Sequence, residues 1–362
     1  MILLIGGASL SASPYIYSYI EILEKNAIPY DFIFWNRDMH DIANYPTNFF
    51  PYNKLCDNSI PRYRRICPMI HFKSFVKQQM KGKDYDAIIV FTIGTAFIIQ
   101  NILKKYKGKY ILDIRDHSPI CKYDFFNRVK KMIYNSSFTS ISSHGFLEWL
   151  PKLSVNKYVV THNTRKDLIL KGLDSIEEDC TIDINNLKIL TIGQIRDFST
   201  NVMLLSQLKN NPAITMLYAG YGATEQKLHL YATEQNVGNA FFVGRYKKEE
   251  EEDIVKKCDM INAMTGHDIN SDSLMSNRFY LSVLYGKPML VTENTYQAKL
   301  VKQYGLGVVI GKEKGLYSSI ISYCNNFDQY NYYRGRREFL RKALNDIFIF
   351  ESKILDTINK FL

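Results

Sequence analysis

The chain has 362 residues, more than one ordinary domain holds, so its length favours two domains. Hydrophobic residues make up 46% and charged residues 23%, a balance that excludes a disordered or fibrous protein. The net charge of +10 indicates an acidic partner, such as nucleic acid, anionic lipid or a phosphate-bearing substrate. No apolar run is long enough to span a bilayer and the start resembles no signal peptide, so we expect a cytoplasmic protein.

The first half of the chain alternates short apolar runs with helical stretches. MILLIGG reads as a strand ending in glycines, PYIYSYIEILEKN has apolar residues at helical spacing, and YDFIFWNRD returns to strand character. The same order recurs in YDAIIVF, TAFIIQNILKKYKG and KYILDIRD, with FTSISS and KYVVTHN as later strands. This alternation predicts a parallel sheet with crossover helices.

The alternation restarts after the polar, acidic stretch LDSIEEDCTIDINN. The strands LKILTIGQ, ITMLYAGYG, AFFVG, DMINAMTG and KPMLVTE are separated by the helices NVMLLSQLKNN, TEQKLHLYATEQN, KEEEEDIVKKC and SNRFYLSVLYG. The sequence therefore predicts an α/β protein of two Rossmann-like domains facing across a cleft, residues 1–170 and 185–340.

The tail from Tyr332 to Leu362 reads as an amphipathic helix. Its expected buried stripe consists of Phe339, Leu340, Ala343, Leu344, Ile347 and Phe348. We expect the last part, about residues 345–362, to pack back on the first domain.

The six cysteines are scattered, with no C-x-x-C pair and no histidine at zinc-ligand spacing: Cys56, Cys67, Cys121, Cys180, Cys258 and Cys324. Neither a disulfide framework nor a metal knuckle is indicated. We expect reduced thiols, mostly buried.

In open α/β sheets, ligands bind beyond the carboxyl ends of the strands, so the residues just after each strand are site candidates. In the second domain these are Gly193, Arg196, Gly220, Gly222, Arg245, Gly266, His267, Ser276, Asn277 and Arg278. Together they predict a rim of backbone N–H groups and guanidinium donors suited to a diphosphate. Any single glycine has a simpler explanation, because glycine permits a tight strand-to-helix turn.

The segment SDSLMSNRFYLSVLYGKPMLVTE is the most specific in the chain. Ser276 or Ser273 is expected to cap a helix whose positive N-terminal end, with Asn277 and Arg278, faces an anion. The GKP sequence at 286–288 then ends the helix and begins the next strand.

This segment resembles the donor-binding stretch of retaining GT-B glycosyltransferases of the family 4 type, often written NKxxEALAxGKPVI. LTIGQIRD, LYAGYGATEQKL and AFFVGRYKKEEEEDIVKKCDM resemble other segments of that family's nucleotide domain, in the same order. The likeness covers most of residues 187–311. It is weaker in the first domain, where YDAIIVFTIGTAFIIQNILKKYKGKYILDIRDHSP and FTSISSHGFLEWLPK are similar to acceptor-domain strands.

The resemblance implies a glycosyltransferase of bacterial capsule or surface-polysaccharide assembly. It implies that the second domain holds a nucleotide diphosphate sugar as co-substrate, with no further cofactor, and that the first domain binds a glycan or lipid-linked acceptor. Transfer would retain configuration and need no metal. Arg196, Arg278 and the helix start at Ser276-Asn277 would stabilise the departing diphosphate.

Two departures from the family pattern leave the donor sugar and the stereochemical outcome open. The family's E-x7-E pair falls on Ser273 and Leu281, so the carboxylate that normally grips the ribose is missing. The usual Arg and Lys after the first strand fall on Gln194 and about Ser199, which leaves Arg196 as a substitute.

Four polar residues end a first-domain strand, where a catalytic or acceptor-orienting group is expected: Asp113, Arg115, Asp116 and His117. With Arg196, we take Asp116 and His117 as catalytic candidates. An Asp-His pair also occurs as a loop cap with a solvated imidazole, which is the alternative.

Gly6 and Gly7 follow the first strand and resemble the family's acceptor-side glycine loop. The chain lacks the G-x-G-x-x-G of a dinucleotide site and has no G-x-x-x-x-G-K-S/T, so NAD and ATP chemistry lose support. His144 and His162 have no visible Ser or Asp partner for a hydrolase triad. The D-x-D at 84–86 precedes its strand, at the wrong edge for a ligand, so no metal site is expected.

Basic residues of the first domain are interleaved with aromatic and aliphatic ones. The basic set is Arg62, Arg64, Arg65, Lys73, Lys77, Lys81, Lys83, Lys122, Arg128, Lys130 and Lys131, and the apolar set is Tyr63, Ile66, Phe72, Phe75, Tyr123, Phe125, Phe126, Met132 and Ile133. Such a mixture suits contact with an anionic membrane, and a solvated face is the alternative. A membrane contact would place the protein at the inner face of the cell membrane, where the resemblance implies a lipid-linked acceptor.

Two other functions remain open at the level of sequence. A GT-B-fold sugar-nucleotide epimerase needs acid and base carboxylates, for which Asp113, Asp116 and Glu293 are the candidates. A nucleic-acid-binding protein rests on net charge alone, without a recognisable module, so we expect no nucleic acid as partner.

Overall fold

The computed structural model describes residues 1–39, 45–56, 60–121, 125–176, 180, 182–311 and 315–361. It divides the chain into two compact units. The first comprises Met1–His162 and Asp346–Leu362, and the second Asn163–Asn345. The chain therefore passes between the units twice, and the long helix α14 (Gln329–Asn359) contributes to both. Among the described residues, no helix is long and apolar enough to cross a membrane.

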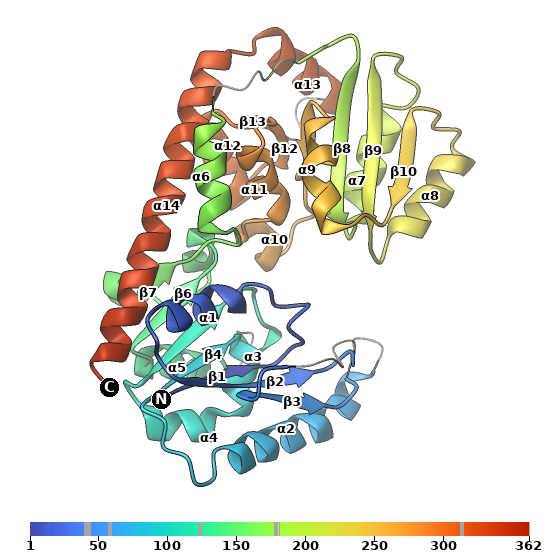
Figure 1. Cartoon of the computed structure of the whole chain (residues 1–362). Helices are drawn as coiled ribbons and strands as arrows, with labels where there is room; N and C mark the ends of the chain where they lie inside the picture. The colour runs from blue at the N-terminus through green and yellow to red at the C-terminus, as the bar shows by residue number, and fades with distance from the viewer. Residues whose placement is uncertain are drawn as a thin grey trace. The chain divides into compact units, whose positions relative to one another are not determined.

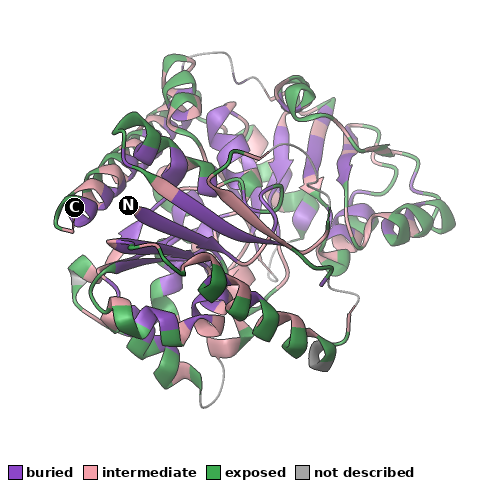
Figure 2. Ribbon diagram, turned by 60° about the horizontal axis from the view of Figure 1, so that its bottom comes forward, coloured by how far each residue is buried: buried purple, intermediate pink, exposed green. Residues whose placement is uncertain are grey.

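The first unit is built on a seven-stranded parallel sheet with the order β3-β2-β1-β4-β5-β6-β7 (Figure 1). The strands are β1 (Ile2–Gly6), β2 (Tyr30–Asn36), β3 (Phe49–Asn53), β4 (Ala87–Phe91), β5 (Tyr110–Ile114), β6 (Phe138–Ile141) and β7 (Tyr158–Val160). The central strands are buried along their whole length, as Figure 2 shows in purple. A strand buried on both faces needs a layer of helices on each.

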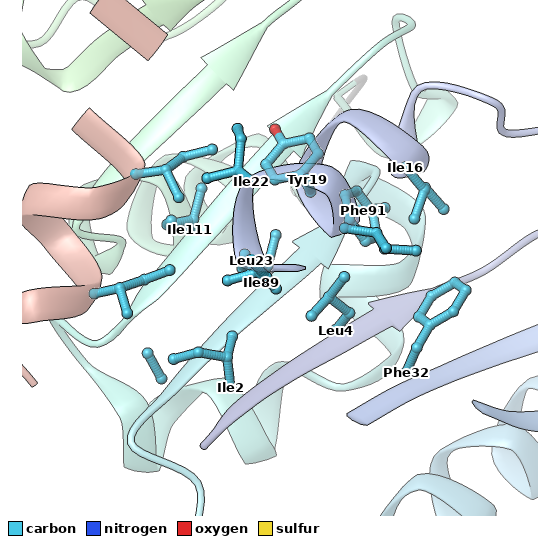
Figure 3. Close-up of a cluster of buried hydrophobic side chains, with 14 of the residues drawn as sticks. Ile2, Leu4, Ile16, Tyr19, Ile22, Leu23, Phe32, Ile89, Phe91 and Ile111 are labelled. Carbon is cyan, nitrogen blue, oxygen red and sulfur yellow. The ribbon is translucent and has the colours of Figure 1, made fainter. Parts of the chain in front are cut away.

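One layer consists of α1 (Ile16–Lys25) and the end of α14. Figure 3 shows Tyr19 and Leu23 of α1 over Leu4 of β1 and Ile89 of β4. Phe350 and Ile354 of α14 belong to the same cluster. The other layer consists of α2 (Ile66–Gln79), α3 (Ile93–Ile98), α4 (Gln100–Leu103) and α5 (Phe126–Asn135). Short 3₁₀ turns join these elements: η1 (Arg62–Arg65), η2 (Lys104–Tyr106), η3 (Pro119–Cys121), η5 (His144–Glu148) and η6 (Val155–Lys157).

The second unit repeats the design with a six-stranded parallel sheet of order β10-β9-β8-β11-β12-β13. The strands are β8 (Leu187–Gln194), β9 (Ile214–Tyr221), β10 (Ala240–Gly244), β11 (Met260–Asn262), β12 (Met289–Thr292) and β13 (Gly307–Ile310). Its elements besides α14 are α6 (Lys166–Asp174), α7 (Phe198–Gln207), α8 (Glu225–Glu234), η7 (Lys248–Glu250), α9 (Glu251–Lys256), α10 (Ile269–Ser273), α11 (Asn277–Leu284), α12 (Tyr296–Tyr304) and α13 (Leu316–Asn325). Two parallel α/β units confirm the predicted fold class.

The C-terminal helix packs on the first unit, as predicted, but its buried stripe differs at two positions. Phe339, Leu340, Ala343 and Ile347 are buried, whereas Leu344 is half-buried and Phe348 is 48% exposed. The stripe continues instead through Phe350, Ile354 and Ile358, which join the core of the first unit. A residue at 348 lies one helical step from the buried Ile347, and this step of about 100° carries its side chain out of the stripe.

Candidate functional site

The carboxyl ends of β8 and β11 form the switch point of the second sheet. The chain runs from β8 outward to β9 and β10 on one side, and through β11 to β12 and β13 on the other. Loops that leave neighbouring strands in opposite directions open a crevice, where ligands of such sheets bind. The two loops meet here, because a Cβ added to Gly266 after β11 lies 3.4 Å from Oδ1 of Asp197 after β8. Arg196 and His267 lie on the same two loops.

Two of the predicted glycines have a packing role at this edge. Gly220 has a φ of +134°, and an added Cβ would lie 2.0 Å from the carbonyl oxygen of Gly193. A Cβ on Gly222 would lie 2.2 Å from the carbonyl oxygen of Ile195. Both glycines therefore let the ends of β8 and β9 approach closely, which is the simpler explanation for their presence.

Arg278 of α11 joins the two strands of the switch point. Its Nε donates to the carbonyl oxygen of Ile192 at 2.7 Å and its Nη2 to that of Gln194 at 2.7 Å, both at the end of β8. Its Nη1 lies 3.4 Å from the carbonyl oxygen of Asn262, the last residue of β11. Within the described part of the chain, three of the five N–H donors of the guanidinium are thus engaged, which leaves two for another acceptor. Burial lowers its pKa to about 10, so it stays a cation at neutral pH.

Ser276, rather than Ser273, caps α11. The Ser276 hydroxyl accepts from the backbone N–H of Phe279 at 3.2 Å and donates to Oε1 of Gln297 at 2.7 Å. Ser273 is buried and donates to the carbonyl oxygen of Ile269. The cap leaves the first N–H groups of α11, beginning at the exposed Asn277, at the positive end of the helix.

The remaining donor-side candidates are exposed at this edge. Arg196 lies in the loop just after β8, and its Nε donates to Oε1 of Gln194 at 2.5 Å. Arg245 follows β10 and stacks over the ring of Tyr221, at 4.0 Å from the ring centroid. His267 pairs with Asp272, with 2.7 Å between Nδ1 and Oδ1. The second unit therefore carries its candidates at one edge of one sheet.

The first sheet has its switch point between β1 and β4, and the acceptor-side glycines lie there. Gly6 ends β1, and a Cβ on Gly7 would lie 2.2 Å from Oγ1 of Thr95 in α3. Thr92 directly follows β4 and has a φ of +73°. Its side chain caps α3 by accepting from the backbone N–H of Thr95. The close approach of this helix to β1 explains Gly7 sterically.

Asp113 and Arg115 form a buried ion pair next to this edge. Nε and Nη2 of Arg115 donate to the two carboxylate oxygens at 2.7 and 2.9 Å. Tyr19 and Ser140 donate to the same carboxylate. Burial alone lowers the pKa of Arg115, but the charge and hydrogen bonds of Asp113 outweigh burial and raise the net value. Asp113 is thus committed to four donors, which weakens the epimerase hypothesis that needed it as an acid or base.

Asp116 and His117 follow this pair into the open edge of the first sheet. Asp116 is exposed and His117 is half-buried. The His117 ring meets the ring of Trp149 edge-on, with 5.0 Å between centroids and 86° between planes. Sequence reasoning missed Trp149 because a single aromatic residue in a loop carries no periodic signal.

A second contact was also invisible in the sequence. Nε2 of His162 lies 3.1 Å from Oδ2 of Asp346, and both side chains are largely buried. The two residues flank the points where the chain leaves the first unit and returns to it. His162 thus has an aspartate partner 184 positions away in the chain.

In the described part of the chain, no three His, Cys, Asp or Glu side chains are grouped to hold a metal ion.

A pocket of about 220 Å³ lies at the opposite, amino edge of the second sheet, where α6, α9 and α11 end. It is cationic in composition, with Lys171, Lys256, Lys287 and Arg336 among its lining residues. Glu252 pairs with Lys171 at 2.6 Å and with Lys256 at 2.9 Å, and these bonds lower its pKa. The other two cations donate to carbonyl oxygens at helix C-termini, Lys287 to that of Lys256 and Arg336 to that of Leu284. The cations of this pocket are therefore used in packing the helices.

No protein-family model matches the chain, and no curated protein is similar to it in sequence. Solved structures do match. HepE from Anabaena, crystallised with UDP, has a TM-score of 0.67 and 14% identity over 99% of both chains. Sucrose-phosphate synthase from Thermosynechococcus elongatus gives 0.69 and 12% over 99% of both chains. A glycosyltransferase from Rickettsia africae gives 0.66 and 12%, over 99% of this chain and 98% of its own. The chain therefore has the two-unit GT-B fold of these proteins.

Proposed function

We propose that the protein is a glycosyltransferase that moves a sugar from a nucleotide diphosphate sugar to a hydroxyl group of a glycan. The observation that carries the proposal is the edge of the second sheet, where Arg278 and the capped start of α11 flank the switch point. The shared fold adds support, because HepE was crystallised both with UDP and with UDP-glucose.

The diphosphate of the donor is the group that we assign to this edge. Arg278 offers two N–H donors, the start of α11 offers backbone N–H groups, and the exposed Arg196 adds a second guanidinium. The diphosphate gains negative charge as its bond to the sugar breaks. Donors that are already in place stabilise that charge without reorganisation, which lowers the barrier.

We assign the acceptor to the first unit, with Asp116 and His117 as the groups nearest to its hydroxyl, and Gly6 and Gly7 beside it. The acceptor oxygen forms its bond to the anomeric carbon while the bond to the diphosphate oxygen breaks. The acceptor proton passes to the leaving diphosphate, as front-side displacement with retention requires. The proposed step needs no metal and no cofactor besides the co-substrate.

Ligand binding tests the donor site. We would titrate the purified protein with UDP-, GDP-, TDP- and CMP-sugars and follow thermal stability and heat of binding. One nucleotide class should bind saturably, and Arg196→Ala should weaken it about 10-fold or more, because a charge-assisted bond to phosphate is lost. Arg278→Ala should weaken it too, although this variant also loses the carbonyl bonds to β8.

Arg341→Ala is the matched control, because Arg341 is exposed on α14 within the same unit. Its affinity should equal that of the unmodified protein. Arg196→Ala decides the matter if Arg278→Ala unfolds, since the Arg196 side chain bonds only to an exposed glutamine side chain in the hydrogen bonds described above. A flat response to the whole panel would overturn the proposal.

We further propose a lipid-linked glycan of capsule or surface-polysaccharide assembly as the acceptor, and a peripheral position at the inner face of the cell membrane. The resemblance of the sequence motifs and the cationic first unit support this. Once the donor is known, transfer of its labelled sugar into an organic-extractable fraction of bacterial membranes tests it. Label found only in water-soluble glycans would contradict it.

A further inference from the structure

One helical layer of the first unit has an unusual charge. The layer consists of α2, α3, α4 with the following turn η2, and α5, all on the face of the sheet opposite α1 (Figure 1). Phe72 of α2 stacks on Trp35 of β2 at 5.3 Å, and Tyr110 of β5 donates to the carbonyl oxygen of Met132 in α5. α3 contacts both α2 and α5, so the helices form one continuous surface.

This layer contains no carboxylate side chain. The sequence has no Asp or Glu at 60–83, at 87–112 or at 125–137, the three stretches that supply its helices. The stretches instead expose lysines to solvent: Lys77 and Lys81 in the first, Lys104, Lys105, Lys107 and Lys109 in the second, and Lys130 and Lys131 in the third. Lys83 of the expected basic set is different, because it pairs with Asp31 at 2.7 Å. Lys122, Tyr123 and the side chains of Arg62 and Tyr63 lie outside the described residues.

The opposite layer has the reverse balance. α1 contributes Glu21, Glu24 and Lys25. The part of α14 that belongs to the first unit contributes Asp346, Glu351, Lys353 and Asp356. Five carboxylates against two lysines make these two helices acidic, so the excess of positive charge in the α2–α5 layer is not shared by the helices on the opposite face.

The cationic layer also exposes large apolar side chains. Ile66 and Ile70 of α2 are 58% and 57% exposed, and Tyr134 of α5 is 66% exposed. Ile66, Ile70 and Lys77 lie on one side of α2, because positions four and eleven apart share a helical face. Phe72 and Val76 hold the other side of the helix on the sheet. α2 therefore presents an aliphatic end and a cationic end to whatever it meets.

We propose that the α2–α5 layer docks on an anionic lipid bilayer, with Ile66 and Ile70 inserted among the headgroups and the lysines paired with lipid phosphates. Lysines alone would suit any polyanion. The exposed isoleucines favour a bilayer over a nucleic acid. Proteins bind nucleic acids through cations and aromatic stacking, and isoleucine provides neither. Binding to an anionic bilayer is strengthened both by apolar side chains buried at the headgroup boundary and by cations next to them.

This inference deepens the proposed function, since it names the surface that would bring the protein to a membrane-borne acceptor, but its test does not involve transfer. Nucleotide binding without vesicle binding would sink the docking surface alone. Vesicle binding without nucleotide binding would sink the donor site alone.

The experiment is sedimentation of the full chain with two kinds of vesicle, phosphatidylcholine alone and phosphatidylcholine mixed with phosphatidylglycerol. The unmodified protein should bind the anionic vesicles and not the neutral ones. The double variant Lys77→Gln/Lys81→Gln should bind about 25-fold more weakly, at about 5-fold for each lysine near the surface. Ile66→Ser/Ile70→Ser should lose about 10-fold or more, even though its charge is unchanged.

Matched controls lie in the second unit, just after α7 and on α8. Lys209→Gln/Lys227→Gln removes the same charge, and Leu230→Ser removes an apolar side chain that is 59% exposed. Both should bind vesicles like the unmodified protein. Equal losses in the control variants would mean that net charge, not this layer, governs binding. Loss of RNA binding in the lysine variant, with vesicle binding insensitive to the isoleucines, would overturn the proposal in favour of a polyanion.

Discussion

Glycines at the strand ends of the second unit differ in what surrounds them. Gly220 has a backbone carbonyl where its Cβ would be, whereas Gly244, with a φ of +77°, has nothing within 4 Å of that position. The first glycine is fixed by packing and conformation, and the second by conformation alone. Residue type is therefore under different constraints at two positions that look alike in the sequence.

Gly220→Ala should lower the free energy of unfolding by about 3 kcal/mol or more, because the methyl group meets the immovable backbone of Gly193. Gly244→Ala should cost only about 1–2 kcal/mol, the penalty of a left-handed conformation. Urea unfolding followed by circular dichroism compares them. Equal costs at the two positions would contradict the packing explanation.

The thiols differ in reactivity for a similar local reason. Cys258 is buried and donates to the carbonyl oxygen of Val255, and burial raises its pKa to about 12. Burial raises the pKa of Cys180 to about 11. At pH 8 these thiols hold almost no thiolate, while Cys67 is exposed on α2. Native-state alkylation followed by mass spectrometry should modify Cys67 first, and Cys180 and Cys258 only after denaturation. Early modification of Cys258 would contradict its burial.

At the scale of elements, Arg336 of α14 links the C-terminal ends of two helices. Its Nε donates to Val283 and its Nη2 to Leu284, both at the end of α11, each at 2.7 Å. Its Nη1 donates to Ser175 at 3.0 Å, just beyond α6. A cation here satisfies carbonyls that no helix hydrogen bond reaches, and it complements two helix dipoles.

Arg336→Met should therefore destabilise the second unit by about 3 kcal/mol or more, because several buried carbonyls lose their donor. Arg341→Ala on the same helix should stay within about 0.5 kcal/mol, since Arg341 is exposed. Far-ultraviolet circular dichroism in urea reports the change. A loss equal to that of Arg341→Ala would mean that water replaces the guanidinium.

At the scale of the whole molecule, α14 makes the first unit depend on the last residues of the chain. Phe350, Ile354 and Ile358 enter a core whose other members come from residues before 160. Both tryptophans, Trp35 and Trp149, lie in the first unit, so their fluorescence reports its unfolding.

Ile354→Ala should lower the fluorescence-detected stability by about 2–5 kcal/mol, because it opens a cavity at a fully buried position. Ile349→Ala is the control, since Ile349 is 50% exposed, and its effect should stay within about 0.5 kcal/mol. If both variants unfold at the same urea concentration as the unmodified protein, α14 is not part of this core.

The strands and helices with a strong period were predictable, and those without one were missed. β3 was missed because its five residues include Pro51, which reads as a turn. It is an edge strand that pairs only with β2, and an edge strand tolerates a residue without an N–H. The exposed Phe348 was misplaced because a stripe read from sequence cannot say where the partner surface changes.

The candidate site was predictable as a set of strand ends, and the roles within it were not. The sequence placed Arg278 beside a helix start, but only the fold shows that three of its donors bind β8 and β11. From the sequence Asp113 was a candidate acid or base, but in the fold its carboxylate accepts hydrogen bonds from Arg115, Tyr19 and Ser140.

The amino-acid sequence by itself determined that the chain forms two parallel α/β units, since periodicity is a local property that each segment carries alone. It also determined the acid-free stretches, which are a matter of composition. The tertiary structure decided which of these stretches share a face, which glycines are held by a neighbouring backbone and which charges are already neutralised. Those properties depend on pairs of residues far apart in the chain, and a contact between distant residues leaves no period in the sequence of either.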